Sequence, residues 1–228
     1  MGDLASRIME ELTCKTAFTI PVFGGIPIAE SVAVSWIIMG VLVVLSIVLT
    51  RHLRVTEPTR RQVALETAVT GLEHIFDGIL GEKGRRYVPY MVTVLLYIGV
   101  SNIIGLFGLK PPTKDLNVTA ALALMSIILV ETSGIRSKGL KGWLKSFADP
   151  SPVIAPMNLL EVIIRPLSLC MRLFGNVLGA FVIMELIKQL LPVALPVPFS
   201  LYFDIFDGLL QAYVFTFLTS MFIQEKIN

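Results

Sequence analysis

The chain has 228 residues, of which 54% are hydrophobic and 16% are charged, and its mean hydropathy is +0.77. These values lie outside the range of ordinary soluble domains and predict a polytopic membrane protein. A net charge of +2 is too small to indicate nucleic-acid binding, and Cys14 and Cys170 give neither a disulfide framework nor a metal-ligand spacing. No phosphate-binding loop, zinc-protease motif or nucleophile elbow is present, so the sequence predicts no cofactor, no metal and no enzyme chemistry.

The sequence predicts an all-α integral membrane protein that forms a single membrane domain over residues 1–228. We expect five membrane-embedded helices, one amphipathic helix on the membrane surface, and a long, strongly tilted helical hairpin at the carboxyl end. Residues 1–31 contain several prolines and glycines, which favours a short helix followed by an irregular external segment. Residues 32–50 are uncharged and form the first predicted span, because about twenty helical residues cross ~30 Å of hydrocarbon.

Residues 56–80 predict an amphipathic helix, with apolar side chains on one face and acidic and hydroxyl side chains on the other. The uncharged segments 87–109 and 116–135 form the next two spans. They are predicted to make a helical hairpin, because Lys110 and the two prolines after it end the first span. Residues 136–156 are basic and rich in turn-forming residues, so we expect a cytoplasmic loop there.

The segment 157–191 stays compatible with a helix for 35 residues, which is far longer than the bilayer requires. Such a helix must tilt strongly or break, and Pro166 marks the predicted kink. Residues 197–225 form the last helix, which ends in a polar tail. These two helices make up the predicted carboxyl-terminal hairpin.

The basic residues are distributed unevenly between the connections. They gather in 51–86 and 136–145, whereas the opposite connections hold only Lys110 and Lys114, or none. By the positive-inside rule, the two basic segments and the carboxyl terminus are predicted to be cytoplasmic. The amino terminus is then outside, in agreement with an odd number of spans.

A polar stripe runs along the helix predicted over 157–191. At about 100° per residue, five polar side chains share one narrow face: Glu161, Arg165, Ser168, Arg172 and Asn176. A charged side chain at the bilayer centre costs about 2.5 to 3.5 kcal/mol, so Arg172 is expected to face water, protein or a partner. Such a residue is by default a functional-site hypothesis.

The members of this stripe differ in what surrounds them. Glu161 and Arg165 have the favourable i, i+4 spacing, so a structural ion pair explains them as well as a functional role does. Arg172 has no carboxylate three or four residues away on either side, so its counter-charge is not local. Gly175 and Gly179 leave room beside it for the close approach of another surface.

The last predicted helix carries a second polar face with Asp204, Asp207 and Gln211. Acidic residues at a helix start are often caps, and this explanation stays open for Asp204. Gln211 lies deeper in the helix. Its amide could pair with Arg172 across the hairpin or hold another helix.

Glu185 is a further candidate, and Asn117 and Glu131 are weaker ones. Glu185 forms a polar cluster with Lys188 and Gln189 on the face opposite Arg172, although Glu185 and Lys188 could equally be an interfacial ion pair. Asn117 and Glu131 are intramembrane polar residues, and interhelical hydrogen bonds or helix starts explain most such cases.

With MRLFGN at Met171–Asn176, DLNVT at Asp115–Thr119 and LLQAYVFTFLT around Gln211, the sequence resembles subunit a of the F-type ATP synthase membrane sector. The resemblance covers nearly the whole chain. It implies a non-catalytic stator that faces a rotating ring of c subunits and contacts b-type stalk subunits, within a bacterial plasma membrane. It further implies two half-channels for protons, separated by an essential arginine that faces the ring carboxylate.

The resemblance carries over residue by residue. Arg172 matches the arginine of the family motif, Asn176 its asparagine, and Gln211 the glutamine of the last helix. The chain departs from the pattern at Phe181, where many members have Glu or His. Glu185 lies one turn further and is a candidate replacement. Asp204 stands where relatives place a titratable residue, with Asp207 close by.

An alternative is a self-contained secondary transporter that binds an anionic substrate with its intramembrane charges. Many such transporters have internal repeats with paired broken helices, and no repeat of this kind is visible in the sequence. Transport by the purified chain in liposomes would separate the two hypotheses. The sequence leaves open whether the coupling ion is a proton or sodium, because the ring carboxylate is on another chain.

Overall fold

The computed structural model describes residues 16–20, 26–51, 53–54, 58–107, 109–147, 155–190 and 196–227. Two strands come first, β1 (Thr16–Ile20) and β2 (Ile26–Ala29). The long helices that follow are α2 (Glu30–Thr50), α3 (Arg60–Gly84), α4 (Val88–Ile103), α5 (Leu116–Ser146), α6 (Ala155–Leu190) and α8 (Gly208–Ile227). Shorter helical segments are Arg85–Tyr87, Ile104–Phe107, Pro112–Lys114, α7 (Pro196–Leu201) and the π-helical turn Tyr202–Asp207.

Within the described residues, five helical stretches are long and apolar enough to cross a membrane. They are Glu30–Thr50, Arg60–Phe107, Leu116–Ser146, Ala155–Ile187 and Pro198–Ile227. This confirms the prediction of an all-α integral membrane protein with five spans. Helices suit the hydrocarbon of a bilayer, because a helix satisfies its backbone hydrogen bonds internally where no water is present.

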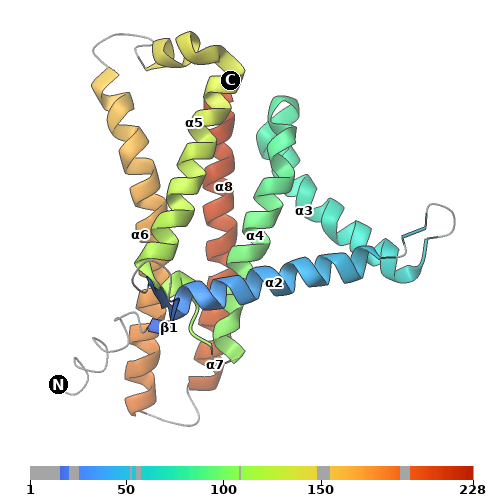
Figure 1. The fold of residues 1–228 in the computed structure, drawn as a ribbon, viewed down its shortest axis with the longest axis vertical. Coiled ribbons are helices and arrows are strands. Elements are labelled where there is room, and N and C mark those ends of the chain that lie inside the picture. The colour runs from blue at the N-terminus through green and yellow to red at the C-terminus, as the bar shows by residue number, and fades with distance from the viewer. Residues whose placement is uncertain are drawn as a thin grey trace.

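Four of the long helices form one bundle. In Figure 1, α4, α5, α6 and α8 run side by side, whereas α2 crosses this bundle and α3 returns obliquely from the far end of α2. The two directions cannot both follow the bilayer normal. If α2 crosses the bilayer upright, the bundle helices are steeply tilted, which is the geometry expected of a helix as long as α6.

The core is centred on α8, which contacts α3, α4, α5 and α6. Phe76, Ile98, Leu173 and Ile223 are fully buried between these helices. Several buried hydroxyl residues bond to a carbonyl of their own helix, as Thr216 Oγ1 does when it donates to the Ala212 carbonyl at 2.9 Å. Since lipid is as apolar as the core, close packing and interhelical hydrogen bonds hold such a bundle together.

The amino-terminal segment differs from the prediction. β1 and β2 pair as an antiparallel hairpin, with Phe18 opposite Ile28, where we expected an irregular segment. The alternation of β-branched and aromatic residues in TAFTI explains the strand. The short helix expected before it lies outside the described residues.

The predicted loop over 136–156 is wrong for its first half. α5 continues to Ser146 and bends at Gly139, which has φ 73°. Trp143 on this extension donates from Nε1 to Glu131 Oε2 at 2.7 Å, and its ring packs edge-on against Phe147. The prediction missed this part of the helix because the segment is basic, although its apolar residues recur at helical spacing.

Other boundaries also differ from the prediction. α3 begins at Arg60 after Thr59, whose hydroxyl accepts from the Gln62 amide, so the start lies later than residue 56. α6 runs through Pro166 as one helix, so of the two expected outcomes, a break or a strong tilt, the helix does not break. The last helix of 197–225 is instead α7, a π-helical turn and α8 in sequence.

Candidate functional site

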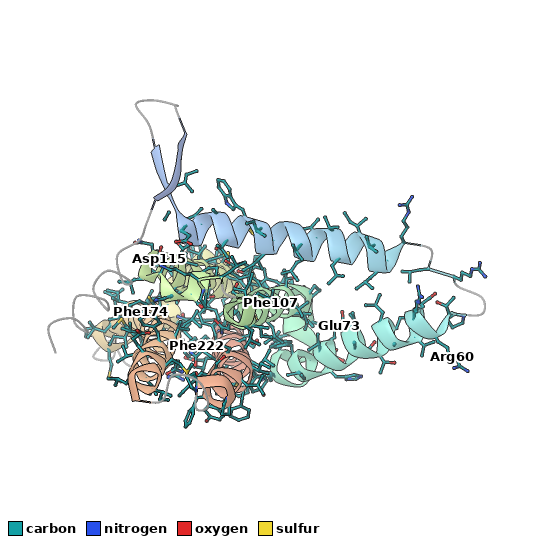
Figure 2. The ribbon with its side chains drawn as sticks, turned by 90° about the horizontal axis from the view of Figure 1, so that it is seen from below. Arg60, Glu73, Phe107, Asp115, Phe174 and Phe222 are labelled. Atoms are coloured by element: carbon teal, nitrogen blue, oxygen red, sulfur yellow. The ribbon has the colours of Figure 1, made fainter. Side chains whose placement is uncertain are left out.

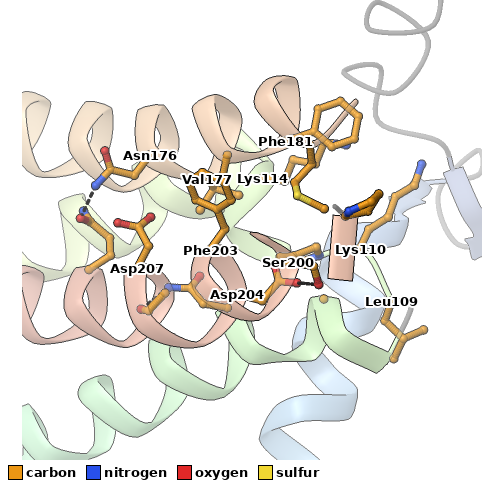
Figure 3. Close-up of a pocket in the computed structure, with 18 residues that line it drawn as sticks. Leu109, Lys110, Lys114, Asn176, Val177, Phe181, Ser200, Phe203, Asp204 and Asp207 are labelled. Atoms are coloured by element: carbon orange, nitrogen blue, oxygen red, sulfur yellow. Dashed lines mark hydrogen bonds between the residues drawn. The ribbon is translucent and has the colours of Figure 1, made fainter. Parts of the chain in front are cut away.

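A cavity of about 500 Å³ lies where the α4–α5 connection, α6 and the start of α8 meet (Figure 3). Four residues predicted for the site line it: Asn176 from α6, Asp204 and Asp207 from the π-helical turn, and Gln211 from α8. Residues 35 positions apart in sequence therefore share one polar space. Figure 3 shows Asn176 and Asp207 toward one end of it and Lys110 with Leu109 toward the other.

An amide pair lies at one end of the cavity. Asn176 Nδ2 donates to Gln211 Oε1 at 2.5 Å, which joins α6 to α8. Gln211 is 2% exposed, and its Nε2 is buried without a hydrogen-bond partner in the described part of the chain. Of the two roles expected for Gln211, contact with Arg172 or with another helix, the structure shows the contact with the neighbouring helix.

The two aspartates lie on a π-helical turn that interrupts the last helix. Such turns insert an extra residue into a helix and leave its backbone hydrogen bonding irregular. Asn102 of α4 donates from Nδ2 to the Gly208 carbonyl at 2.8 Å, and Thr113 Oγ1 donates to Asn102 Oδ1 at 2.7 Å. This buried chain of hydrogen bonds fixes the turn that carries both carboxylates.

Two glycines allow this close approach. A Cβ on Gly208 would lie 2.8 Å from Cβ of Asn102, and a Cβ on Gly105 would lie 3.2 Å from Asp204 Oδ1. Asp204 also accepts from Ser200 Oγ at 3.1 Å, and it lines the cavity. The capping explanation for Asp204 stays a prediction.

Two lysines complete the charge of the cavity. Lys110 and Lys114 line it from the α4–α5 connection, together with Asp204 and Asp207. Lys114 Nζ lies 3.3 Å from the ring centroid of Phe181 on α6. Sequence reasoning used both lysines only for topology. The signal was available, because Lys110 and Lys114 are the basic residues of the connection between α4 and α5.

Arg172 does not line this cavity. It is exposed on α6, one turn before Asn176, and makes no hydrogen bond or ion pair with any described residue. An ideal Cβ placed on Gly175 or Gly179 meets no atom within 4 Å, so this side of α6 is open. Its neighbours Ile164, Leu167 and Met171 are more than half exposed, so the arginine stands on an uncovered apolar face.

The remaining polar residues of the stripe are paired away from the cavity. Arg165 Nη2 contacts Glu161 Oε2 at 2.5 Å and Glu225 Oε1 at 2.8 Å, and its guanidinium lies 4.7 Å from the Phe222 ring centroid. The structural ion pair expected from the i, i+4 spacing is therefore present. Glu225 on α8 extends it across the hairpin, which the sequence did not predict.

Glu131, Asn117 and Glu185 also lie outside the cavity lining. Glu131 forms an ion pair with Lys226 Nζ at 3.4 Å, between α5 and α8. Asn117 is exposed, and its backbone amide donates to Asp115 Oδ1 at 2.9 Å, as expected at a helix start. Glu185 lies on α6 one turn beyond Phe181. Its proposed pairing with Lys188 involves a side chain outside the described part.

Comparison with known proteins identifies the family of this chain. A family described as ATP synthase A chain matches residues 32–224. The chain belongs to the ATP synthase subunit a family. ATP synthase subunit a of Moorella thermoacetica is 38% identical over 206 residues, which cover 90% of this chain and 94% of the relative. A sodium-ion-specific ATP synthase subunit a of Propionigenium modestum is 32% identical over 220 residues, covering 90% of this chain and 76% of the relative.

A third relative, subunit a 1 of Pelobacter propionicus, is 39% identical over 205 residues, covering 88% of each chain. Membership in the ATP synthase subunit a family, together with the five apolar helices, makes this chain an integral membrane protein of the Fo sector. Its role is that of an ion-translocating stator, and the other subunits of the ATP synthase are its partners.

Proposed function

We propose that Arg172 is the charge that separates two half-channels for protons and faces the carboxylate of a rotating c-ring, so that ion flow drives ring rotation. The observation that carries this proposal is the setting of Arg172. It is exposed on an open face of α6, unpaired within the described chain, beside Gly175 and Gly179 that admit a close neighbour. A membrane-embedded arginine without a partner among the described residues is explained by a partner carboxylate on another chain.

The physical mechanism follows from charge in a low-dielectric medium. A ring carboxylate that faces lipid is neutral, because an ionised acid in hydrocarbon is heavily penalised. Near a guanidinium at ~4 Å and an effective dielectric of ~20, the ionised form gains about 4 kcal/mol. The carboxylate therefore releases its proton beside Arg172. A potential of 100 mV adds about 2.3 kcal/mol per charge, which gives the cycle a direction.

The cavity is the outer half-channel in this proposal. Asp204 and Asp207 provide carboxylates along its wall, and the Asn176–Gln211 pair lies at one end of it, one helical turn from Arg172. Glu185, on the same helix beyond Phe181, is a further candidate on the path. Glu161, Arg165 and Glu131 brace the helices, since their charges are already paired, and Asn117 supports the start of α5.

In the assembled complex, the open face of α6 contacts the c-ring, and b-type stalk subunits hold the chain as a non-catalytic stator. The basic segments and the carboxyl terminus lie in the cytoplasm of a bacterium, with the amino terminus outside its plasma membrane. The basic composition of 51–86 and 136–145 supports this orientation.

Replacing Arg172 tests the proposal. Arg172→Ala in the intact complex should abolish ATP synthesis driven by an ion gradient, while the complex assembles with all its subunits. Arg165→Ala is the matched control on the same helix, because that arginine is paired within the chain. Full synthesis in the Arg172→Ala complex would refute the role assigned to this residue. Repeating the wild-type assay with and without sodium identifies the coupling ion.

A further inference from the structure

The ionisable group that the family pattern leads us to expect at position 181 is missing from α6, where the residue is Phe181. The structure brings a charge to this place from another element. Lys114, at the end of the short helical turn Pro112–Lys114, lies with its Nζ 3.3 Å from the Phe181 ring centroid. An ammonium over an aromatic face is attracted by the ring quadrupole, most strongly where water is partly excluded.

The surroundings of Lys114 indicate what this charge does. The same cavity contains Asp204 and Asp207, three residues apart on one turn. Two carboxylates that share a small site disfavour each other's ionised forms, unless a cation compensates them. Lys114 and Lys110 are the cationic side chains in the described lining of this cavity, so the lining holds two positive and two negative groups.

We propose that Lys114, seated on Phe181, is an ion-path residue whose ammonium balances the carboxylates of Asp204 and Asp207 in the charge of the cavity lining. Lys114 belongs to the α4–α5 connection and supplies a positive charge at this point of the path. Phe181 is the positioning residue that holds the Lys114 ammonium. The inference rests on the proposed role of the cavity as a half-channel. In this inference the ring of Phe181 holds the ammonium of Lys114, because α6 has no ionisable side chain of its own at position 181.

The charged groups near this point come from three elements. The α4–α5 connection carries Lys110, Lys114 and Asp115. The Asp115 carboxylate accepts hydrogen bonds from Ser31 Oγ and from the Asn117 backbone amide at the start of α5. The turn before α8 carries Asp204 and Asp207, and α6 carries Glu185 and Arg172 on either side of Phe181. Of these, Lys114 is the cation that contacts the ring.

The test separates the effect of the Lys114 charge from the effect of side-chain shape, and it uses the whole ATP synthase. ATP-driven ion pumping into vesicles is measured for Lys114→Met, Lys114→Arg, Phe181→Leu and Phe181→Tyr, with ATP hydrolysis by the same complexes as the assembly check. Lys114→Met should lower pumping about tenfold, because one full charge is removed from a confined site. Phe181→Leu should lower it about threefold through loss of the cation–π contact. The Arg and Tyr variants should stay close to wild type.

Lys138→Met is the matched control, because Lys138 is exposed on the α5 extension and does not line the cavity. Wild-type pumping by Lys114→Met would overturn the inference, as would a Lys114→Arg variant as impaired as Lys114→Met, since that result indicates packing and not charge. Arg172→Ala in the same assay separates the two proposals. If it pumps normally, the proposed function fails; if it does not pump while Lys114→Met does, only the role of Lys114 fails.

Discussion

The charged residues at the two ends of the α6–α8 hairpin are arranged in opposite ways. At the end near the carboxyl terminus, Arg165 is held by Glu161 and Glu225, and Glu131 is held by Lys226. At the other end, carboxylates and amides line a cavity of about 500 Å³. Figure 2, viewed along the bundle, shows how closely the helices that carry both groups pack. The polar residues of one end are thus paired with each other, whereas those of the other end face the cavity that we propose as an ion path.

The largest effect is expected from the cavity carboxylates. Replacing Asp204 and Asp207 together by Asn should lower ion pumping by the complex at least about tenfold, because the carboxylates that we propose accept the moving cation are removed. Glu131→Gln is the matched acidic control from the braced end. Pumping assays in vesicles measure both. Equal losses in the two variants would mean that the two ends do not differ in function.

A second prediction concerns the turn that carries the carboxylates. Gly208→Ala should destabilise the chain by about 1 to 3 kcal/mol, because the new Cβ would lie 2.8 Å from Cβ of Asn102 and overpack the contact. Gly175→Ala is the control, since its Cβ meets open space. Thermal unfolding of the purified chain in detergent measures the difference. A Gly208→Ala variant as stable as Gly175→Ala would show that the turn tolerates rearrangement.

The smallest effect is expected at the braced end. Arg165→Ala should lower stability by about 1 kcal/mol, because Glu161 and Glu225 are partly exposed and such pairs are weak. Arg172→Ala should leave the stability of the isolated chain unchanged, since Arg172 has no partner within the described residues. Both variants can be compared in the same unfolding assay. A larger loss of stability for Arg172→Ala than for Arg165→Ala would show that Arg172 has a stabilising contact within the chain.

Patterns that extend over many residues could be predicted from sequence. The five apolar stretches gave the spans, because the thickness of a bilayer fixes the length of a helix that crosses it. Short or mixed signals misled the prediction. The hairpin β1–β2 and the helical continuation of α5 past Gly139 depend on a few apolar residues, and prolines, glycines or basic residues obscured them.

The membrane class, the family resemblance and the lack of a carboxylate at helical spacing from Arg172 can all be read directly from the sequence. The tertiary structure decided which distant residues meet. It joined Asn176 to Gln211, held the π-helical turn with Asn102, and brought Lys114 onto Phe181. Such contacts depend on the crossing and register of packed helices, which the periodicity of one segment does not specify.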